Sequence, residues 1–89
     1  MTPQERLALL LRGGKVLYGP SGWQTQLAAG LGINLRTVQR WVAGGVGYPE
    51  PAVIERLAEL LTERAAEIEA MGAEIKMALE APPVEEVEA

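Results

Sequence analysis

WQTQLAAGLGINLRTVQRWVAGG, residues 23–45, contains two short helical patterns joined at a glycine. Ser21, followed three residues later by Gln24, forms a capping-box pattern, so a first helix is expected to begin near residue 22. The inner face of this helix carries two leucines and one small residue, Leu27, Leu31 and Ala28. A small side chain on that face lets a second helix cross closely.

The turn between the two patterns is predicted at Gly32, because a tight connection between helices needs a backbone with positive φ, which glycine adopts without steric cost. Asn34 is a favourable N-cap for a second helix over residues 35–43. Val38 and Trp41 are three residues apart and therefore face the same way. We expect both to be buried against three apolar residues of the first helix and the turn: Leu27, Leu31 and Ile33.

The other face of this second helix is predicted to be polar and basic. It presents long guanidinium and amide side chains together with two apolar residues, Leu35, Arg36, Gln39, Arg40 and Ala43. Base edges and phosphates in a DNA major groove require side chains of this kind at this spacing. The stretch therefore indicates a helix-turn-helix whose second helix binds DNA.

The string LAAGLGINLRTVQRWVAG resembles the helix-turn-helix of the lambda-repressor-like (Cro/C1, XRE-type) DNA-binding family. The wider stretch LYGPSGWQTQLAAGLGINLRTVQRWVAGG is similar to small bacterial and phage regulators with a WQ…LA…LG…RTV.RW pattern. The small residue, the turn glycine and the buried hydrophobic residues all fall in register.

The resemblance implies that Gln24 and Thr37 contact DNA phosphates. It further implies that five residues face the groove and contact bases: Asn34, Leu35, Arg36, Gln39 and Arg40. One departure lies upstream, where Trp23 takes the place of the threonine or serine that the family commonly has before the glutamine. We expect its ring to pack on the core, in place of the usual phosphate contact.

The composition argues against catalysis and against a membrane protein. A chain of 89 residues suits one small domain. It contains no His, Cys or Asp, so it lacks the usual general base, the usual nucleophile pair and almost every metal constellation, leaving only Glu, Ser, Thr, Tyr and Lys. We therefore expect no enzyme, cofactor, metal or small-molecule ligand. Because there is neither a signal peptide nor an apolar run long enough to span a membrane, we expect a cytoplasmic protein.

The net charge of −4 is divided unevenly along the chain. Residues 1–49 carry five Lys and Arg against one Glu, whereas residues 50–89 carry three against eleven Glu. The helix-turn-helix therefore lies in a basic half, whose field attracts phosphate, and the acidic half is expected to point away from the duplex.

The N-terminal stretch predicts a helix over residues 3–12, because Thr2, Pro3 and Glu5 form a capped helix start. The glycine pair at 13–14 weakens this helix by about 1 kcal/mol per glycine, although the apolar stripe continues to Tyr18. The loop 44–51 is too rich in Gly and Pro for regular structure, and we expect Tyr48 to pack its ring on the domain.

The C-terminal half repeats apolar residues every seven positions from residue 51 to 79. One series is Ile54, Leu61, Ile68 and Ile75, and the other is Leu57, Arg64, Met71 and Ala78. Such a heptad pattern favours a two-stranded helix pair, so we expect a homodimer through Leu61, Ile68, Met71 and Ile75. Folding back onto the same chain and docking on a different protein are the alternatives. Whether Gly72 breaks the helix stays open.

These patterns predict an all-α fold of four or five helices. Residues 1–62 form the lambda-repressor-like domain, residues 63–80 a helical dimerisation extension, and residues 81–89 a disordered acidic tail. The expected function is a dimeric, sequence-specific regulator of transcription that inserts residues 35–43 into the major groove of an inverted-repeat operator. We expect a repressor, since the chain has no room for a separate effector domain. The alternative is an antitoxin-like or adaptor protein acting through its acidic C-terminal helix.

Overall fold

The first helix begins as the sequence predicts. In the computed structural model, which describes residues 1–81, α1 spans Pro3–Tyr18. The Thr2 hydroxyl accepts a hydrogen bond from the Glu5 N–H at 3.0 Å, and the Glu5 carboxylate accepts one from the Thr2 N–H at 2.6 Å. This reciprocal capping box satisfies two of the backbone donors that a helix start leaves open.

Helix α1 continues through Gly13 and Gly14 to Tyr18, so it runs past the end predicted near residue 12 and follows the apolar stripe that continues to Tyr18. Both glycines are buried. A Cβ on Gly13 would lie 2.9 Å from a methyl of Leu57, and one on Gly14 would lie 2.5 Å from the ring of Trp23. The glycine pair therefore marks the place where two other elements approach α1 closely, at a cost of about 1 kcal/mol of helix propensity per glycine.

Helix α2 spans Trp23–Leu31, so it begins where the sequence predicts, but its cap differs from the prediction. Its N-cap is Gly22, in the left-handed conformation with φ of 71°, and no side chain caps the helix. The capping box expected from Ser21 and Gln24 is therefore wrong. Trp23 is buried, and its ring lies against Gly14, which confirms its expected place in the core. Tertiary packing of this ring, not a side-chain cap, positions the start of α2.

The connection between α2 and α3 is the predicted tight turn. Gly32 has φ of 73°. The Ile33 N–H donates to the Ala28 carbonyl at 3.0 Å, and the Gly32 N–H donates to the Ala29 carbonyl at 3.2 Å. This pair of bonds is a Schellman motif, which satisfies carbonyls left open at the end of α2. Helix α3 then spans Leu35–Val42, one residue shorter than predicted.

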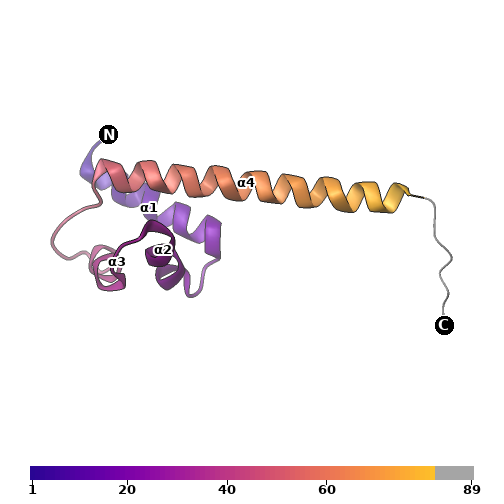
Figure 1. Cartoon of the computed structure of the whole chain (residues 1–89). Coiled ribbons are helices and arrows are strands. Elements are labelled where there is room, and N and C mark those ends of the chain that lie inside the picture. The colour runs from indigo at the N-terminus through magenta and orange to yellow at the C-terminus, as the bar shows by residue number, and fades with distance from the viewer. Residues whose placement is uncertain (82–89) are drawn as a thin grey trace.

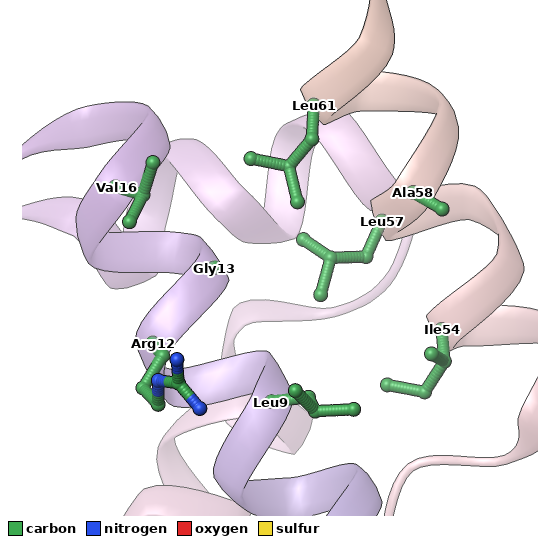
Figure 2. Close-up of a pocket in the computed structure, with 8 residues that line it drawn as sticks. All are labelled: Leu9, Arg12, Gly13, Val16, Ile54, Leu57, Ala58 and Leu61. Carbon is green, nitrogen blue, oxygen red and sulfur yellow. The ribbon is translucent and has the colours of Figure 1, made fainter.

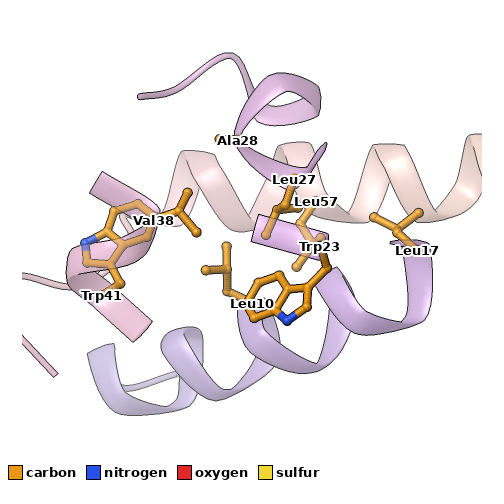
Figure 3. Packing of buried hydrophobic residues seen from close by; sticks show 8 residues of the cluster. All are labelled: Leu10, Leu17, Trp23, Leu27, Ala28, Val38, Trp41 and Leu57. Atoms are coloured by element: carbon orange, nitrogen blue, oxygen red, sulfur yellow. The ribbon is translucent and has the colours of Figure 1, made fainter. Parts of the chain in front are cut away.

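All four helices contribute to one hydrophobic core (Figure 3). Helix α1 packs against α2 and α4, and α2 packs against α3 and α4. The buried side chains are Leu10, Leu17, Trp23, Leu27, Ala28, Val38, Trp41 and Leu57. Leu31 and Ile33 are partly buried against the same cluster. The predicted burial of Val38 and Trp41 is confirmed, with Trp41 only 8% exposed.

The loop between α3 and α4 has no regular structure, as expected, but it is anchored by a residue that the sequence did not single out. Pro49 is fully buried, and its carbonyl accepts a hydrogen bond from Arg6 Nε at 2.6 Å. Tyr48 is 44% exposed, so the expected packing of its ring on the domain is wrong. Pro49 occupies the buried position next to it instead.

Helix α4 spans Pro51–Glu80 without a break (Figure 1). Gly72 lies inside it, so the glycine does not end the helix. The described chain measures 61 × 27 × 18 Å, because the second half of α4 extends beyond the other three helices. Every residue from 65 to 81 is exposed. The alternative in which this segment folds back onto its own chain is therefore wrong.

Arg64 makes the last contact between α4 and the domain. Its guanidinium donates a hydrogen bond to the Leu17 carbonyl at 2.9 Å and lies 5.6 Å from the centre of the Tyr18 ring. A cation at the last carbonyls of α1 also complements the helix dipole. The boundary predicted after residue 62 thus lies inside α4, just before this contact. The predicted tail lies outside the described residues from residue 82 onward.

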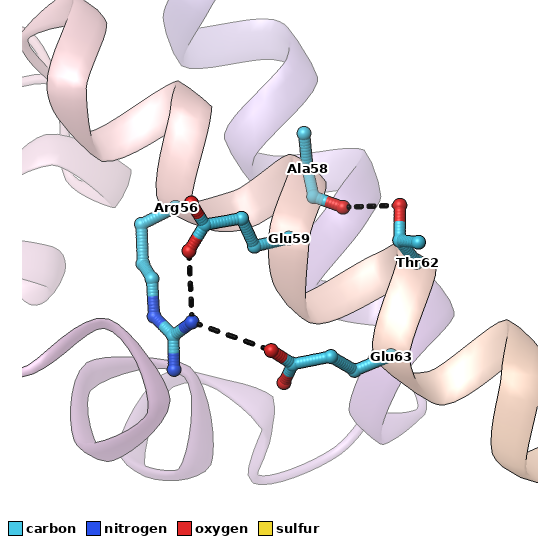
Figure 4. Close-up of polar contacts among 5 residues, drawn as sticks. All are labelled: Arg56, Ala58, Glu59, Thr62 and Glu63. Atoms are coloured by element: carbon cyan, nitrogen blue, oxygen red, sulfur yellow. Dashed lines mark hydrogen bonds and ion pairs between the residues drawn. The ribbon is translucent and has the colours of Figure 1, made fainter.

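The outer side of α4 carries exposed polar contacts within the helix itself (Figure 4). Arg56 lies 3.0 Å from Glu59 and 3.7 Å from Glu63, and the Thr62 hydroxyl donates to the Ala58 carbonyl at 2.9 Å. Exposed ion pairs contribute about 0.2–1 kcal/mol each. These contacts support the helix without fastening it to the domain. None of the helices in residues 1–81 has the length and apolar character needed to cross a membrane.

Candidate nucleic-acid interface

Helix α3 has one buried and one solvent-exposed face. Val38 and Trp41 point into the core, whereas Arg36, Gln39 and Arg40 are exposed. Because the buried face is packed against α2, the exposed side chains project from a helix whose position is held by the core. The sequence placed all five residues on their observed faces, since a helix of 3.6 residues per turn separates these positions cleanly.

Two of the predicted base-contacting residues have structural roles. The Asn34 side chain accepts a hydrogen bond from the Arg36 N–H at 2.8 Å, so its oxygen serves as the predicted N-cap. Leu35 is half-buried and packs against the core. Both lie at the start of α3, beside the exposed basic face. The freely exposed side chains among the five are therefore Arg36, Gln39 and Arg40.

The end of α3 shapes the position of Arg40 in a way that the sequence reading missed. Gly44 has φ of 80°, and the Gly45 N–H donates to the Arg40 carbonyl at 2.8 Å. A Cβ on Gly45 would lie 2.8 Å from Cγ of Arg40. Gly45 therefore leaves room for the aliphatic part of the arginine. The glycine pair that follows α3 is the sequence signal for this arrangement.

The two predicted phosphate contacts lie on neighbouring helices. Thr37 is half-buried on α3, and Gln24 is half-buried as the second residue of α2. Since no side chain caps α2, the N–H groups of its first turn are open to an external acceptor. Helix N-termini of this kind bind phosphate through those groups and through the positive end of the helix dipole.

Not every Lys and Arg of the basic half, residues 1–49, is free to contact DNA. In residues 1–81 the ion pairs all lie on α4, where Arg56 and Arg64 meet glutamates. Arg6 is engaged with the Pro49 carbonyl, and Arg12 lines a groove between α1 and α4. Lys15 is exposed on α1, so Arg36 and Arg40 are the cations that share a helix with exposed Gln39. Acidic α4 lies across the domain from α3 (Figure 1).

The described part of the chain offers no group of three or more acidic residues arranged to hold a metal ion. Comparison with protein-family models, curated proteins and solved structures gives no match. The functional argument therefore rests on the chemistry and placement of the α3 side chains.

Proposed function

We propose that this protein is a sequence-specific DNA-binding regulator of transcription, in which α2, the turn at Gly32 and α3 act as a lambda-repressor-like helix-turn-helix. The observation that supports it is the exposed set Arg36, Gln39 and Arg40 on a helix whose opposite face is buried. Long side chains with several donors, held on a rigid helix, suit recognition of base edges.

In the proposed complex, α3 enters the major groove. Arg36 and Arg40 donate to guanine O6 and N7 or to phosphates, and Gln39 pairs with adenine N6 and N7. Asn34 and Leu35 lie at the groove-facing start of the helix. Thr37 and Gln24, together with the open N–H groups of α2, hold the backbone on either side. Phosphate contacts then set the orientation, and base contacts set the sequence.

The proposed binding unit is a homodimer formed through an apolar stripe on α4, namely half-buried Leu61 and exposed Ile68, Met71 and Ile75. One copy with few exposed cations neutralises few phosphates and binds weakly at physiological salt. A pre-formed dimer makes the second half-site encounter intramolecular, which raises avidity by about 10²–10⁴. Two copies related by a two-fold axis require an inverted-repeat operator. Repression needs no more than occupancy of that operator.

The second candidate function is an adaptor or antitoxin-like protein. It is favoured by a separate observation, the acidic and apolar surface of residues 65–80, all of which are exposed. In that case this segment binds a different protein, and α3 has no essential ligand. The two functions differ in whether the cations of α3 matter, which makes them separable by mutation.

The test starts with selection of bound sequences from random double-stranded DNA by the intact chain. The double variant Arg36→Ala/Arg40→Ala is expected to lose binding and to flatten the slope of log K against log salt by about 3–4 for a dimer. Gln39→Ala should relax one or two base pairs, with about 1–3 kcal/mol of discrimination lost at each. Arg56→Ala removes a cation of α4 that is paired with Glu59 and Glu63, and it should leave binding unchanged.

Failure of the selection to enrich any sequence, or full binding by the double arginine variant, would contradict the DNA-binding proposal. If Gln39→Ala lowers the affinity for all DNA sequences equally, Gln39 contacts the DNA backbone and not a base. Circular dichroism of each variant checks that the fold is intact.

A further inference from the structure

One face of α4 is apolar along its whole length. At about 100° per residue, eight positions spaced alternately four and three apart fall within about 60° of one line along the helix. They are Ile54, Ala58, Leu61, Ala65, Ile68, Gly72, Ile75 and Leu79. We call this face the α4 seam. Its spacing is that of a coiled-coil heptad, and every second position is small until Leu79 ends the row.

The seam overlaps only in its first half with the side of α4 that holds the domain, because Ile54 and Leu61 also pack against the core. The other residues of α4 that contact the domain, Leu57, Leu60 and Arg64, lie about 50–110° to one side of the seam line. In the second predicted heptad series, Leu57 and Arg64 are therefore occupied within the chain, whereas Met71 and Ala78 are exposed. Most of the seam stays uncovered, with Ile68 65% and Leu79 80% exposed.

The first half of the seam forms one wall of an apolar groove of about 370 Å³ (Figure 2). That wall consists of Ile54, Ala58 and Leu61, with Leu57 at the floor. Helix α1 supplies the other wall through Leu9, Arg12, Gly13 and Val16. Val16 is 75% exposed although it is apolar. An apolar helix lying along the seam would therefore cover residues of α1 as well.

We propose that the occupant of the seam is α4 of a second copy, lying antiparallel with its two-fold axis between residues 66 and 67. Residues 54–79 of the two helices then overlap over about 39 Å, and the C-terminal half of each α4 fills the groove of the other copy. The inference rests on the homodimer of the proposed function and adds its orientation and register.

Side-chain sizes support this orientation. Ala58 lies opposite the partner's Ile75, Leu61 opposite the partner's Gly72, and Ala65 opposite the partner's Ile68. Each small residue thus meets a large one, which fills space at native density. A parallel pair in register would set alanine on alanine and glycine on glycine, and the voids would forfeit contact energy.

Gly72 is explained by the same arrangement. Nothing in its own chain lies within 4 Å of a Cβ built there, yet glycine costs the helix about 1 kcal/mol relative to alanine. Close approach of the partner's Leu61 supplies a reason for the absent side chain.

Charges flanking the seam select the register. In the proposed dimer Glu55 lies beside the partner's Lys76, and the two-fold axis creates this pair twice. A slip of one heptad in one direction sets Glu69 beside the partner's Glu69. The opposite slip sets Glu55 beside the partner's Glu69. Of these three registers, only the full overlap avoids a like-charge pair at the flanking positions, which specify partner orientation in coiled coils.

The antiparallel arrangement also places both domains correctly for one DNA duplex. Its two-fold axis is perpendicular to α4, so two domains that each lie to the same side of the seam line end up on the same side of the helix pair. In a parallel pair the axis runs along the helices and places the domains on opposite sides. Helix α3 lies below the first turns of α4 (Figure 1). Counted along α4 from residues 51–57, the two α3 helices are about 30–45 Å apart, which includes one DNA turn of about 34–36 Å.

The orientation is tested without DNA by pulsed electron-spin distance measurement on the intact chain. The sequence contains no Cys, so Met77→Cys gives one spin label per copy on an exposed residue facing away from the seam. Full antiparallel overlap predicts a label separation of about 30–40 Å, and a one-heptad slip changes the axial part by about 10 Å. A separation below about 25 Å, or a monomer at tens of micromolar, overturns the proposal.

The register is tested by charge exchange, with dimer dissociation measured by sedimentation. Glu55→Lys or Lys76→Glu alone creates two repulsive pairs and should weaken the dimer by about 3- to 30-fold. The double variant restores opposite charges and should return to within about threefold of the parent. Glu63→Lys makes the same charge change on the side opposite the seam and should have no comparable effect. Absence of rescue in the double variant overturns the register.

These outcomes separate the inference from the proposed function. An antiparallel dimer that binds no DNA leaves the inference standing and removes the proposed function. DNA binding by a monomer or by a parallel dimer supports the proposed DNA binding and overturns the inference.

Discussion

The two halves of α4 have similar apolar spacing and opposite surroundings. Leu57, in the first half, is buried against the domain, whereas Met71, fourteen residues later in the same heptad series, is 50% exposed. Between them Arg64 makes the last bond to α1. The hydrophobic pattern therefore predicts that a helix face seeks a partner, while the rest of the fold decides whether the chain supplies that partner itself.

The strongest contrast is expected between Trp41 in the core and Met77 on the exposed half of α4. Trp41→Ala should lower the free energy of unfolding by about 3–5 kcal/mol, because it empties a buried aromatic site. Met77→Ala should change it by less than about 0.5 kcal/mol, as at other exposed positions. Urea denaturation followed by circular dichroism measures both. A small effect of Trp41→Ala would mean that α3 does not depend on this packing.

Leu57 and Met71 sharpen the comparison within one helix. Leu57→Ala should cost about 2–5 kcal/mol at any protein concentration, since its contacts are within the chain. The effect of Met71→Ala should be near zero for diluted monomer and should grow with concentration if the second half of α4 binds another copy. Denaturation at two concentrations a hundredfold apart distinguishes the cases. If Met71→Ala lowers the free energy of unfolding equally at both concentrations, the contacts of Met71 lie within the chain.

Glycine substitutions make the same comparison at the level of the backbone. Gly14→Ala places a Cβ against the Trp23 ring, so overpacking should outweigh the gain in helix propensity and leave a net loss of about 1–2 kcal/mol. Gly72→Ala meets nothing in its own chain and should stabilise the diluted monomer by up to about 1 kcal/mol. Thermal unfolding of the two variants at low concentration is the measurement. Destabilisation by both would show that Gly72 also has a close neighbour within the chain.

The last comparison concerns the boundary between the halves of α4. Arg64→Met keeps the length of the side chain but removes its bond to the Leu17 carbonyl and its charge over Tyr18, which should cost about 1–2 kcal/mol. Arg56→Met, which breaks only exposed ion pairs, should cost less than about 0.5 kcal/mol. Hydrogen exchange at the end of α1 should rise in the Arg64 variant alone. Equal hydrogen exchange in both variants would show that Arg64 does not stabilise the end of α1.

Local signals in the sequence predicted the elements around α3 well. Asn34 caps α3, Gly32 turns the chain, and Val38 and Trp41 are buried, because each of these roles depends on residues within a few positions. Local signals failed where packing between elements that are distant in the sequence determines the structure. Ser21 does not cap α2, because Trp23 positions that helix by packing on α1. The DNA contacts and the homodimer are tested by neither the sequence nor the fold, and they stay predictions.

By itself, the sequence determined that this chain is helical, where the turn at Gly32 lies, and that Arg36, Gln39 and Arg40 share an exposed face, since helical periodicity and backbone sterics act locally. Only the tertiary structure decided that Gly13 and Gly14 lie inside a helix and that Arg6 holds the Pro49 carbonyl. It also decided which apolar residues of α4 are covered. These features depend on which surfaces pack together from distant parts of the chain. A local pattern along the sequence does not show which distant residues come into contact.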